Sequence, residues 1–347
     1  MKIKIAFGTL LAQFLCLVTS AQAQQVFDRI RFAEFQPELY VRPFGKDAAW
    51  NRPIEGIPLH KESAKWVERL WTLSPAARPG NFNLGGFKDY SFPVYDARKA
   101  TTEVEVKSKN PDWGNLQGQT IPWNPEWQAA KGSDGQVIVL DWETGREWNL
   151  WQVKLKGKSL VIGNGSLVSG DFRTKEDGFR PSRGCGIQYL AMLTRPEEIM
   201  KGKIEHALSM PIKNPNSKIF LPPATKTDGD KFGIPNGVPE GMRFALRVTD
   251  EEIEQWITSL PKEFDQSTRY SAKVIAVALR DYGWIITDNS GGAFFQFEYE
   301  GTAGDKWKAL GLGSKKIRDK EYPQDLLDGL ITQERIYAVV SSDQYPP

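Results

Sequence analysis

Between Tyr90 and Leu167 the chain is a succession of short runs rich in Val, Ile, Tyr and Trp, separated by turn residues. Runs of this length and composition are typical of β-strands. Further runs of the same kind occupy residues 203–210, 217–221, 242–248, 283–288 and 293–299. So many short strands in one chain predict a mainly β fold, and we expect a β-sandwich of jelly-roll type.

We also expect a few helices, packed at the edges of this β body. Thr249 and Glu252 have the spacing of a capping box, and Thr194 with Glu197 repeats it ahead of a brief helix. The segments in which apolar side chains recur at helical spacing are residues 61–71, 250–260 and 268–282. These apolar faces are explained by packing against the core and need no functional role.

The first residues predict export. Lys2 and Lys4 precede an apolar run over residues 5–18, and small residues follow at 21–23. This is the pattern of a secretory signal peptide, so we expect cleavage after Ala23 and a periplasmic or secreted product. No later apolar run is long enough to cross a membrane.

The charge of the chain argues against two classes of partner. Without the two lysines of the signal peptide, 43 basic residues balance 43 acidic ones. A neutral chain without runs of Lys or Arg has no electrostatic reason to bind nucleic acid or an anionic membrane. Cys185 is then the single cysteine, so an intramolecular disulfide is not expected and stability must come from the core.

The pattern along the chain predicts one β body with a segment on either side of it. Residues before the body mix aromatics with prolines and show no sustained period, whereas residues 326–340 predict a helix followed by an edge strand. The expected parts are a signal peptide (1–23), an N-terminal arm with a short helix (24–89), the β body with inserted helices (90–300) and a peripheral C-terminal segment (301–347).

Several familiar chemistries are absent from the sequence. It contains no G-x-S-x-G elbow, no complete phosphate-binding loop and no dinucleotide-binding turn. Its two histidines, His60 and His206, do not form a zinc-peptidase motif. Asp228 and Asp230 could contribute to a calcium site, but their spacing does not continue into a full calcium loop. We therefore expect no metal and no cofactor.

The segment "DWETGREWNLWQVK", residues 141–154, carries the most informative pattern. In a strand after the turn, Glu147, Asn149 and Trp151 point one way, while Trp148 and Leu150 point the other. If Trp148 and Leu150 face the core, an acid, an amide and an indole line the opposite face. That combination suits a saccharide, because a sugar ring stacks on an indole while its hydroxyl groups bind carboxylate and amide.

A carbohydrate ligand or substrate is therefore the expected partner, and glycoside hydrolysis the expected reaction. Hydrolysis needs two carboxyl groups across the cleaved bond. We expect Glu147 with Asp141 as this pair and Asp228 as the reserve, with Trp151 and Trp142 as stacking surfaces. The ordinary alternative for these acids is a role as solvated turn residues.

Two other functions remain open. In a polysaccharide lyase, His206 or Tyr189 would remove the α-proton of a uronate while Arg183 neutralises its carboxylate, with Gln188 and Arg243 as further candidates. A non-catalytic carbohydrate-binding or envelope protein would use the same tryptophans without paired acids. A purely structural protein would place all of these residues in its core.

Several stretches taken together resemble a group of exported bacterial proteins that have a β-rich body and no established activity. The resemblance spans about residues 50–292 and implies export and one continuous unit. It assigns no catalytic residue. The stretches that carry it are "WNRPIEGIPLH", "YSFPVYDA", "GSDGQVIVLDWETGREWNLWQ", "RPEEIMKGKIEHAL", "ATKTDG" and "VPEGMRFAL".

Overall fold

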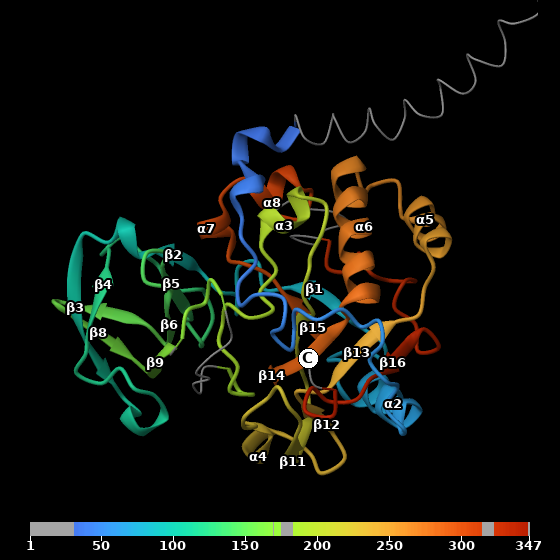
Figure 1. Ribbon diagram of the computed structural model, residues 1–347, viewed down its shortest axis with the longest axis horizontal. Helices are drawn as coiled ribbons and strands as arrows, with labels where there is room; N and C mark the ends of the chain where they lie inside the picture. The colour runs from blue at the N-terminus through green and yellow to red at the C-terminus, as the bar shows by residue number, and fades with distance from the viewer. Residues whose placement is uncertain (1–30, 169, 175–182, 314–322, 346–347) are drawn as a thin grey trace, which may run out of the picture. The chain divides into compact units, whose positions relative to one another are not determined.

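The computed structural model describes residues 31–168, 170–174, 183–313 and 323–345 (Figure 1). The expected signal peptide lies outside these residues. The chain divides into two compact units, residues 1–40 and 41–347. The described part of the first unit holds two short 3₁₀ helices, η1 (Ala33–Phe35) and η2 (Pro37–Leu39).

Among the described residues, strands outweigh helices at 27% against 23%, which is compatible with the predicted mainly β fold. The described strands form three four-stranded and two two-stranded sheets. The smaller sheets, both parallel, pair β1 (Asn83–Gly85) with β15 (Phe294–Gln296) and β11 (Pro215–Phe220) with β12 (Val238–Glu240).

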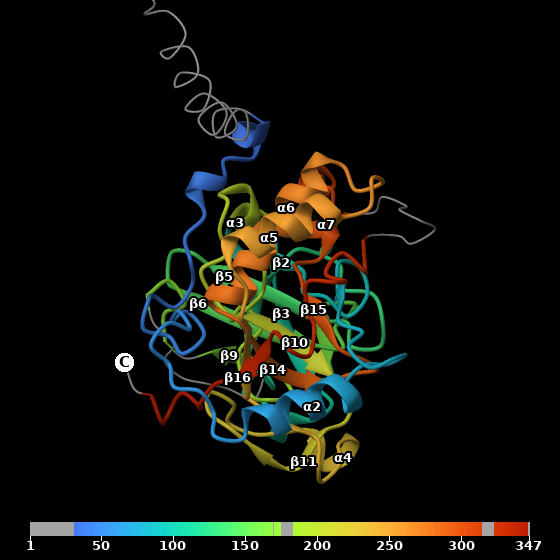
Figure 2. The ribbon, with the colours of Figure 1, turned by 90° about the vertical axis from the view of Figure 1, so that its right-hand side faces the viewer.

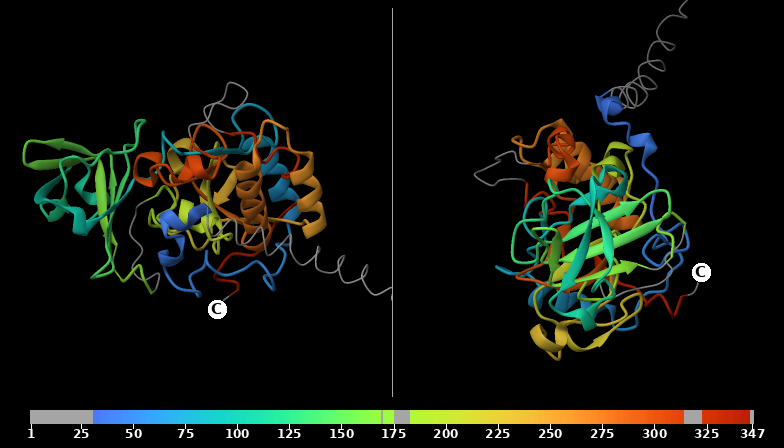
Figure 3. Two further views of the ribbon diagram at one scale, coloured as in Figure 1. Left: turned by 90° about the horizontal axis from the view of Figure 1, so that it is seen from above. Right: turned by 90° about the vertical axis from the view of Figure 1, so that its left-hand side faces the viewer.

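Two of the four-stranded sheets share one core (Figure 3). The first has the order β2 (Val94–Asp96), β5 (Val137–Asp141), β6 (Arg146–Trp151), β9 (Asn164–Val168). The second has the order β4 (Thr120–Trp123), β3 (Thr102–Ser108), β8 (Ser159–Ile162), β7 (Lys154–Lys156). Trp148 and Leu150 of β6 pack into the shared core against Val104 and Val106 of β3. The strand alternation predicted for β6 therefore gives the correct core face.

The third four-stranded sheet has the order β10 (Leu208–Ile212), β14 (Trp284–Asn289), β13 (Arg243–Leu246), β16 (Ile336–Ala338). Strand β10 runs parallel to β14, so the carboxyl ends of both strands lie at the same edge of the sheet. Helix α6 (Gln266–Asp281) packs on β13, and α5 (Asp250–Ser259) packs on α6. Figure 2 shows α2 (Ser63–Leu73) beside β16.

The helices predicted around residues 61–71, 194–200, 250–260 and 268–282 form, with one correction to a capping box. The brief helix α3 (Pro196–Met200) is closed by the backbone N–H of Arg195, which donates to the Glu198 carboxylate at 2.8 Å, and not by Thr194 with Glu197. The remaining short helices are η3 (Ala97–Lys99), η4 (Pro111–Trp113), α4 (Gly229–Phe232), α7 (Glu300–Ala303) and α8 (Lys306–Ala309).

The prediction for residues 326–340 is half wrong. Residues 326–331 form turns instead of a helix, because Gly329 has a φ of 79°. In addition, Trp256 Nε1 donates a hydrogen bond to the carbonyl oxygen of Asp328 at 3.0 Å, so this carbonyl is not paired within a helix. Strand β16 does lie at a sheet edge, as predicted. None of the helices in the described part of the chain is long and apolar enough to span a membrane.

Candidate functional site

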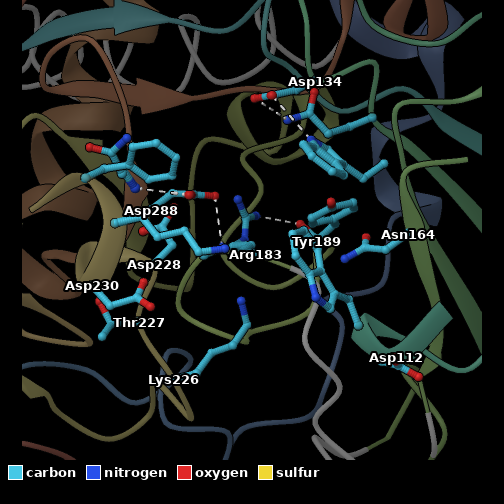
Figure 4. A pocket seen from close by; sticks show the side chains of 17 residues that line it. Asp112, Asp134, Asn164, Arg183, Tyr189, Lys226, Thr227, Asp228, Asp230 and Asp288 are labelled. Atoms are coloured by element: carbon cyan, nitrogen blue, oxygen red, sulfur yellow. Dashed lines mark hydrogen bonds between the residues drawn. The ribbon is translucent and has the colours of Figure 1, made fainter. Parts of the chain in front are cut away.

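A cavity of about 620 Å³ lies where the loops of three chain regions meet (Figure 4). Its volume falls within the range of small-molecule sites, roughly 300–1,000 Å³. Its walls come from η4 and the ends of β6 and β9, from the segment around residues 183–189, and from residues 226–232 with the carboxyl end of β14. Many of the side chains that line it are charged or aromatic.

Three carboxyl groups form a cluster at one wall of this cavity, which Asp228 and Asp288 line and behind which Glu240 is buried. Asp288 stands near the end of β14, Asp228 directly precedes α4, and Glu240 ends β12. One ligand oxygen from each lies within 4.8 Å of the others. Glu240 is fully buried. Within the described part of the chain, neither of its carboxylate oxygens makes a hydrogen bond of ordinary geometry, and the buried Oδ1 of Asp228 has no partner. Three such groups cannot all carry a negative charge without a compensating proton or cation.

The local environment favours protons on two of these three groups. Burial, reinforced by the charge of Asp228, raises the pKa of Asp288 to about 8, although the N–H of Gly184 donates to its Oδ2 at 3.1 Å. Burial and the adjacent Asp228 also raise the pKa of Glu240 well above its usual range. At neutral pH, Asp288 is therefore an acid beside Asp228, and the equilibrium of Glu240 is shifted toward its protonated form.

The same three carboxyl groups could instead hold a divalent cation. Carboxylate oxygens are the ligands that Ca²⁺ and Mg²⁺ prefer. Within the residues that the structure describes, this is the one group of acidic, His or Cys side chains close enough to share an ion. Protons and a cation are thus competing ways to stabilise one cluster, and metal addition distinguishes them.

The backbone at Gly184 lets the two acids of the wall approach each other. A Cβ at this position would lie 2.8 Å from Cγ of Asp228 and would collide with the carboxylate of Asp288. Only glycine leaves room for both groups while its own N–H binds Asp288.

Arg183 connects this wall to the middle of the cavity. Its side chain is 1% exposed, and its terminal nitrogens donate to Gln296 Oε1 at 2.6 Å and to the carbonyl oxygens of Tyr189 and Ala191 at 2.7 and 3.1 Å. Its Nε has no partner among the described residues. Burial lowers the pKa of Arg183 and raises the pKa of the Tyr189 hydroxyl, so neither group gains or loses a proton near neutral pH.

The opposite wall combines an indole with amide and carboxyl groups. The indole Nε1 of Trp151 donates to Asp134 Oδ1 at 3.3 Å, and the amide of Gln136 donates to Asp134 Oδ2 at 3.3 Å. Oε1 of Gln136 is buried and has no partner among the residues that the structure describes, although Gln136 lines the cavity. An unpaired buried acceptor of this kind is available to a ligand hydroxyl.

The residues predicted from the β6 pattern divide between the cavity and the interior. Trp151 lines the cavity, whereas Glu147 and Asn149 are buried at 1% exposure each. Glu147 Oε1 accepts from the Asn149 amide at 2.6 Å and from the Leu190 N–H at 3.0 Å, and Asn149 Oδ1 accepts from the Tyr189 N–H at 2.7 Å. The face expected to be open is covered because two backbone N–H groups of another segment need acceptors there.

Asp141 and Trp142 have structural contacts outside the cavity. Asp141 Oδ1 accepts from the N–H groups of Glu143 and Thr144 at 2.9 and 3.2 Å, which fixes the turn between β5 and β6. The ring of Trp142 packs edge-on against Phe172 at a centroid distance of 5.0 Å. Neither residue lines the cavity, so Asp141 does not face Glu147 across it.

His206 is also remote from the cavity. It is 3% exposed, with Nε2 3.1 Å from Glu198 and Nδ1 2.8 Å from the carbonyl oxygen of Ala207. Burial opposes its charged form, but Glu198 outweighs that effect and raises the pKa of His206. Cys185 is a buried free thiol whose pKa burial raises, so it is not an activated nucleophile.

The buried carboxyl of Glu147 predicts a pH-dependent stability. Burial raises its pKa to about 7, although hydrogen bonds from Asn149 and Leu190 partly offset this. The folded state therefore binds more protons than the unfolded state between about pH 4.5 and 7, so stability is present at low pH and lost as pH rises. Glu147 alone should lower the free energy of unfolding by on the order of 3 kcal/mol between pH 5 and 8.

Urea unfolding of wild type and Glu147→Gln across this range measures the effect. Asp288 contributes in the same direction, so the informative quantity is the difference between the two slopes. We expect a shallower decline in the variant; parallel curves would contradict the prediction.

Four predicted residues thus meet in the cavity: Trp151, Arg183, Tyr189 and Asp228. Asp288, Asp134 and Glu240 were missed. The signal for Asp288 was present, since an acid ends the apolar run "GWIITD" in a strand parallel to β10. Asp134 and Glu240 follow no pattern that distinguishes them from turn residues.

No protein-family model matches this sequence, and no match was found among the curated proteins or the solved structures.

Proposed function

We propose that the protein is a glycoside hydrolase that cleaves a polysaccharide, with Asp288 as general acid and Asp228 as its nucleophilic partner. The observation that carries the proposal is the carboxyl cluster: two adjacent acids line one cavity wall, and burial raises the pKa of one of them, Asp288, to about 8. Pairs of carboxyl groups in different protonation states are the usual machinery of glycoside hydrolysis. The indole of Trp151 and the free acceptor of Gln136 provide the surface expected for a sugar.

In the first step, the Asp288 carboxylic acid donates its proton to the oxygen of the glycosidic bond. The carboxylate of Asp228 attacks the anomeric carbon as the bond between that carbon and the oxygen breaks. The leaving sugar departs with the proton as an alcohol, and the other sugar is held as an ester on Asp228. Glu240, protonated behind Asp228, can donate a hydrogen bond that orients the attacking carboxylate.

In the second step, Asp288 is a carboxylate and takes a proton from a water molecule. The oxygen of that water attacks the anomeric carbon, and the ester bond to Asp228 breaks. Both side chains return to their initial states, and the net reaction adds one water across one glycosidic bond.

The pair expected from the sequence, Glu147 with Asp141, is replaced in this proposal because neither residue lines the cavity. Their interactions fit a supporting role, with Glu147 and Asn149 holding the backbone that presents Tyr189.

A polysaccharide lyase is the second candidate, favoured by the unpartnered Nε of Arg183 beside Tyr189. A buried guanidinium could bind a uronate carboxylate, and Tyr189 could remove the α-proton. The raised pKa of Tyr189 weakens it as a base, which ranks elimination below hydrolysis. His206 does not reach this site.

We also infer that the two sheets that share the core around Trp148 form a β-sandwich with a jelly-roll connection. Their common core and facing arrangement support this. Export by the predicted signal peptide agrees with the proposal, because polysaccharides are met outside the cytoplasm.

The test is incubation of the purified chain with neutral and acidic polysaccharides, following reducing ends and the ultraviolet absorbance of unsaturated uronates. Reducing ends without absorbance support hydrolysis, whereas both signals together support elimination. No signal from any polymer would refute both and leave a binding protein. Melting curves with EDTA and with Ca²⁺ complete the test, since a large Ca²⁺-dependent rise in Tm would assign the cluster to a cation and remove Asp288 as the acid.

Gly184→Ala should impair catalysis without loss of the fold. The added methyl group pushes the carboxylates of Asp228 and Asp288 apart. A displacement of about 1 Å at reacting groups costs roughly a hundredfold in rate. We expect kcat to fall by that order while far-ultraviolet circular dichroism stays unchanged. Wild-type kcat in the variant would show that the proximity of the two acids is not needed.

A further inference from the structure

A second cavity adjoins the first beyond Asp288. It has a volume of about 270 Å³ and is lined by residues around Tyr90, by the loop that follows β14 and by Phe294 and Gln296 of β15. The two cavities share four lining residues: Asp134, Gln136, Asp288 and Asn289. Asp288 therefore has space for a ligand on both of its sides.

Exposed aromatic side chains line both cavities. Phe232 is 59% exposed in the first cavity and Tyr90 is 44% exposed in the second, whereas Trp113, 46% exposed in the first cavity, has Lys231 Nζ over its ring at 4.8 Å from the centroid and keeps only its other face for a ligand. Aromatic faces left open to water beside a cavity are suited to sugar rings. Their positions provide stacking surfaces beyond the acid in two directions.

Tyr90 is held in a conformation that few tyrosines adopt. Its φ is 55°, in the left-handed region, and its N–H donates to the carbonyl oxygen of Lys131 at 3.0 Å. The absence of a side chain at Gly132 leaves room for the Tyr90 ring, because a Cβ at Gly132 would lie 3.0 Å from the ring carbons. Backbone strain at a bulky residue persists only where the surroundings impose it and is concentrated at functional sites.

The junction of the cavities contains an unsatisfied acceptor. Gln136 is 7% exposed, its amide nitrogen donates to Asp134, and its Oε1 has no partner among the described residues. It lines both cavities, as Asp288 does. A sugar hydroxyl beside the cleaved bond would satisfy this oxygen.

We propose that the two cavities form one groove that holds a polysaccharide chain across Asp288, so that the protein cleaves bonds inside the chain. Sugar units then occupy both sides of the cleaved bond, with Tyr90 stacking on one side and Trp113 with Phe232 on the other. This inference rests on the proposed function and specifies its substrate as a polymer longer than a disaccharide.

The experiment compares Tyr90→Ala, Tyr90→Phe and the control Phe220→Ala. Phe220 is 40% exposed but lines neither cavity. On the polymer that wild type cleaves, we expect early products of mixed intermediate lengths. Tyr90→Ala should raise KM about tenfold with kcat little changed, because stacking on one sugar ring is lost. Tyr90→Phe and Phe220→Ala should behave as wild type.

Release of single sugars from chain ends, or an unchanged KM in Tyr90→Ala, would overturn the groove while leaving hydrolysis intact. If no polymer is cleaved, the proposed function fails and the groove is tested by binding. Calorimetric titration of Asp288→Asn with chito-, cello- and alginate oligosaccharides of increasing length should then show affinity that rises with length and falls in the double variant with Tyr90→Ala. Absence of binding to every series would refute the groove as well.

Discussion

Asp288→Asn lowers kcat for polysaccharide cleavage by about 10³-fold, within the 10²–10⁴-fold contribution of a general acid, while KM stays close to wild type. An asparagine keeps the size of the side chain and can still accept from the Gly184 N–H, but it has no proton to give to the leaving oxygen. The matched control is Asp230→Asn, which changes the charge of the same cavity at an exposed residue outside the carboxyl cluster. We expect the control to retain activity.

Asp288→Asn should also change the pH dependence of kcat/KM and of the free energy of unfolding. Because the pKa of Asp288 is raised to about 8, wild-type kcat/KM should fall as pH rises through 8, where the acid loses its proton. The folded state holds this proton and the unfolded state releases it above about pH 4, so stability is also lost as pH rises toward 8. Asp288→Asn should remove that part of the decline in the free energy of unfolding. A variant with wild-type activity, or with an unaltered stability profile, would refute the assignment.

Asp228→Ala should have the larger effect on rate, because the residue forms and breaks a bond to the sugar. We expect the loss in kcat to be at least 10⁴-fold, since removal of the nucleophile blocks the covalent path and leaves only direct attack by water. The shortened side chain leaves a space beside the anomeric carbon. Added azide or formate should enter it, attack from the same face and restore part of the activity with substrates that carry a good leaving group.

The stereochemistry of these reactions gives an independent measurement. Ligand oxygens of Asp228 and Asp288 lie within 4.8 Å of each other, which is too near for the water that inverting enzymes place between their carboxyls. Wild type should therefore release a sugar whose anomeric configuration is the same as that of the cleaved bond. The glycosyl azide formed by Asp228→Ala should have the opposite anomeric configuration. Proton NMR of the first products distinguishes these outcomes. Inversion by wild type would exclude Asp228 as the nucleophile.

The sequence predicts which side chains of a strand point to the same face. It does not predict which other segments of the chain cover that face. The positions of Trp148 and Leu150 follow from the period of a strand, and they do face the core. Whether the other face of β6 meets water depends on the segment around Tyr189, about 40 residues further along the chain. No local period contains that information, so Glu147 was assigned to a binding surface although it is buried.

The acids of the cavity were hard to predict for a related reason. Asp228, Glu240 and Asp288 come from three separate elements, and their proximity depends on the pairing of β14 with its neighbours and on the contact at Gly184. The sequence selected Asp228 only as a reserve, since "TDGDKFG" resembles an ordinary turn. Residue type and spacing can predict a cluster of acidic side chains when one helix or strand carries all of them, which is not the case here.

The hydrogen bonds from β6 to residues 189 and 190 limit how the protein can be divided. Glu147 and Asn149 belong to the sheet pair by their strand, yet their polar groups are satisfied by a segment outside it. If the two sheets were expressed alone, the carboxyl of Glu147 and the amide of Asn149 would be exposed within an apolar face. They would lose the segment at residues 189–190 that shields them from solvent. The sheet pair is therefore not an independent module. A chimeric protein that contains the two sheets must also include residues 189–190, or replace both Glu147 and Asn149.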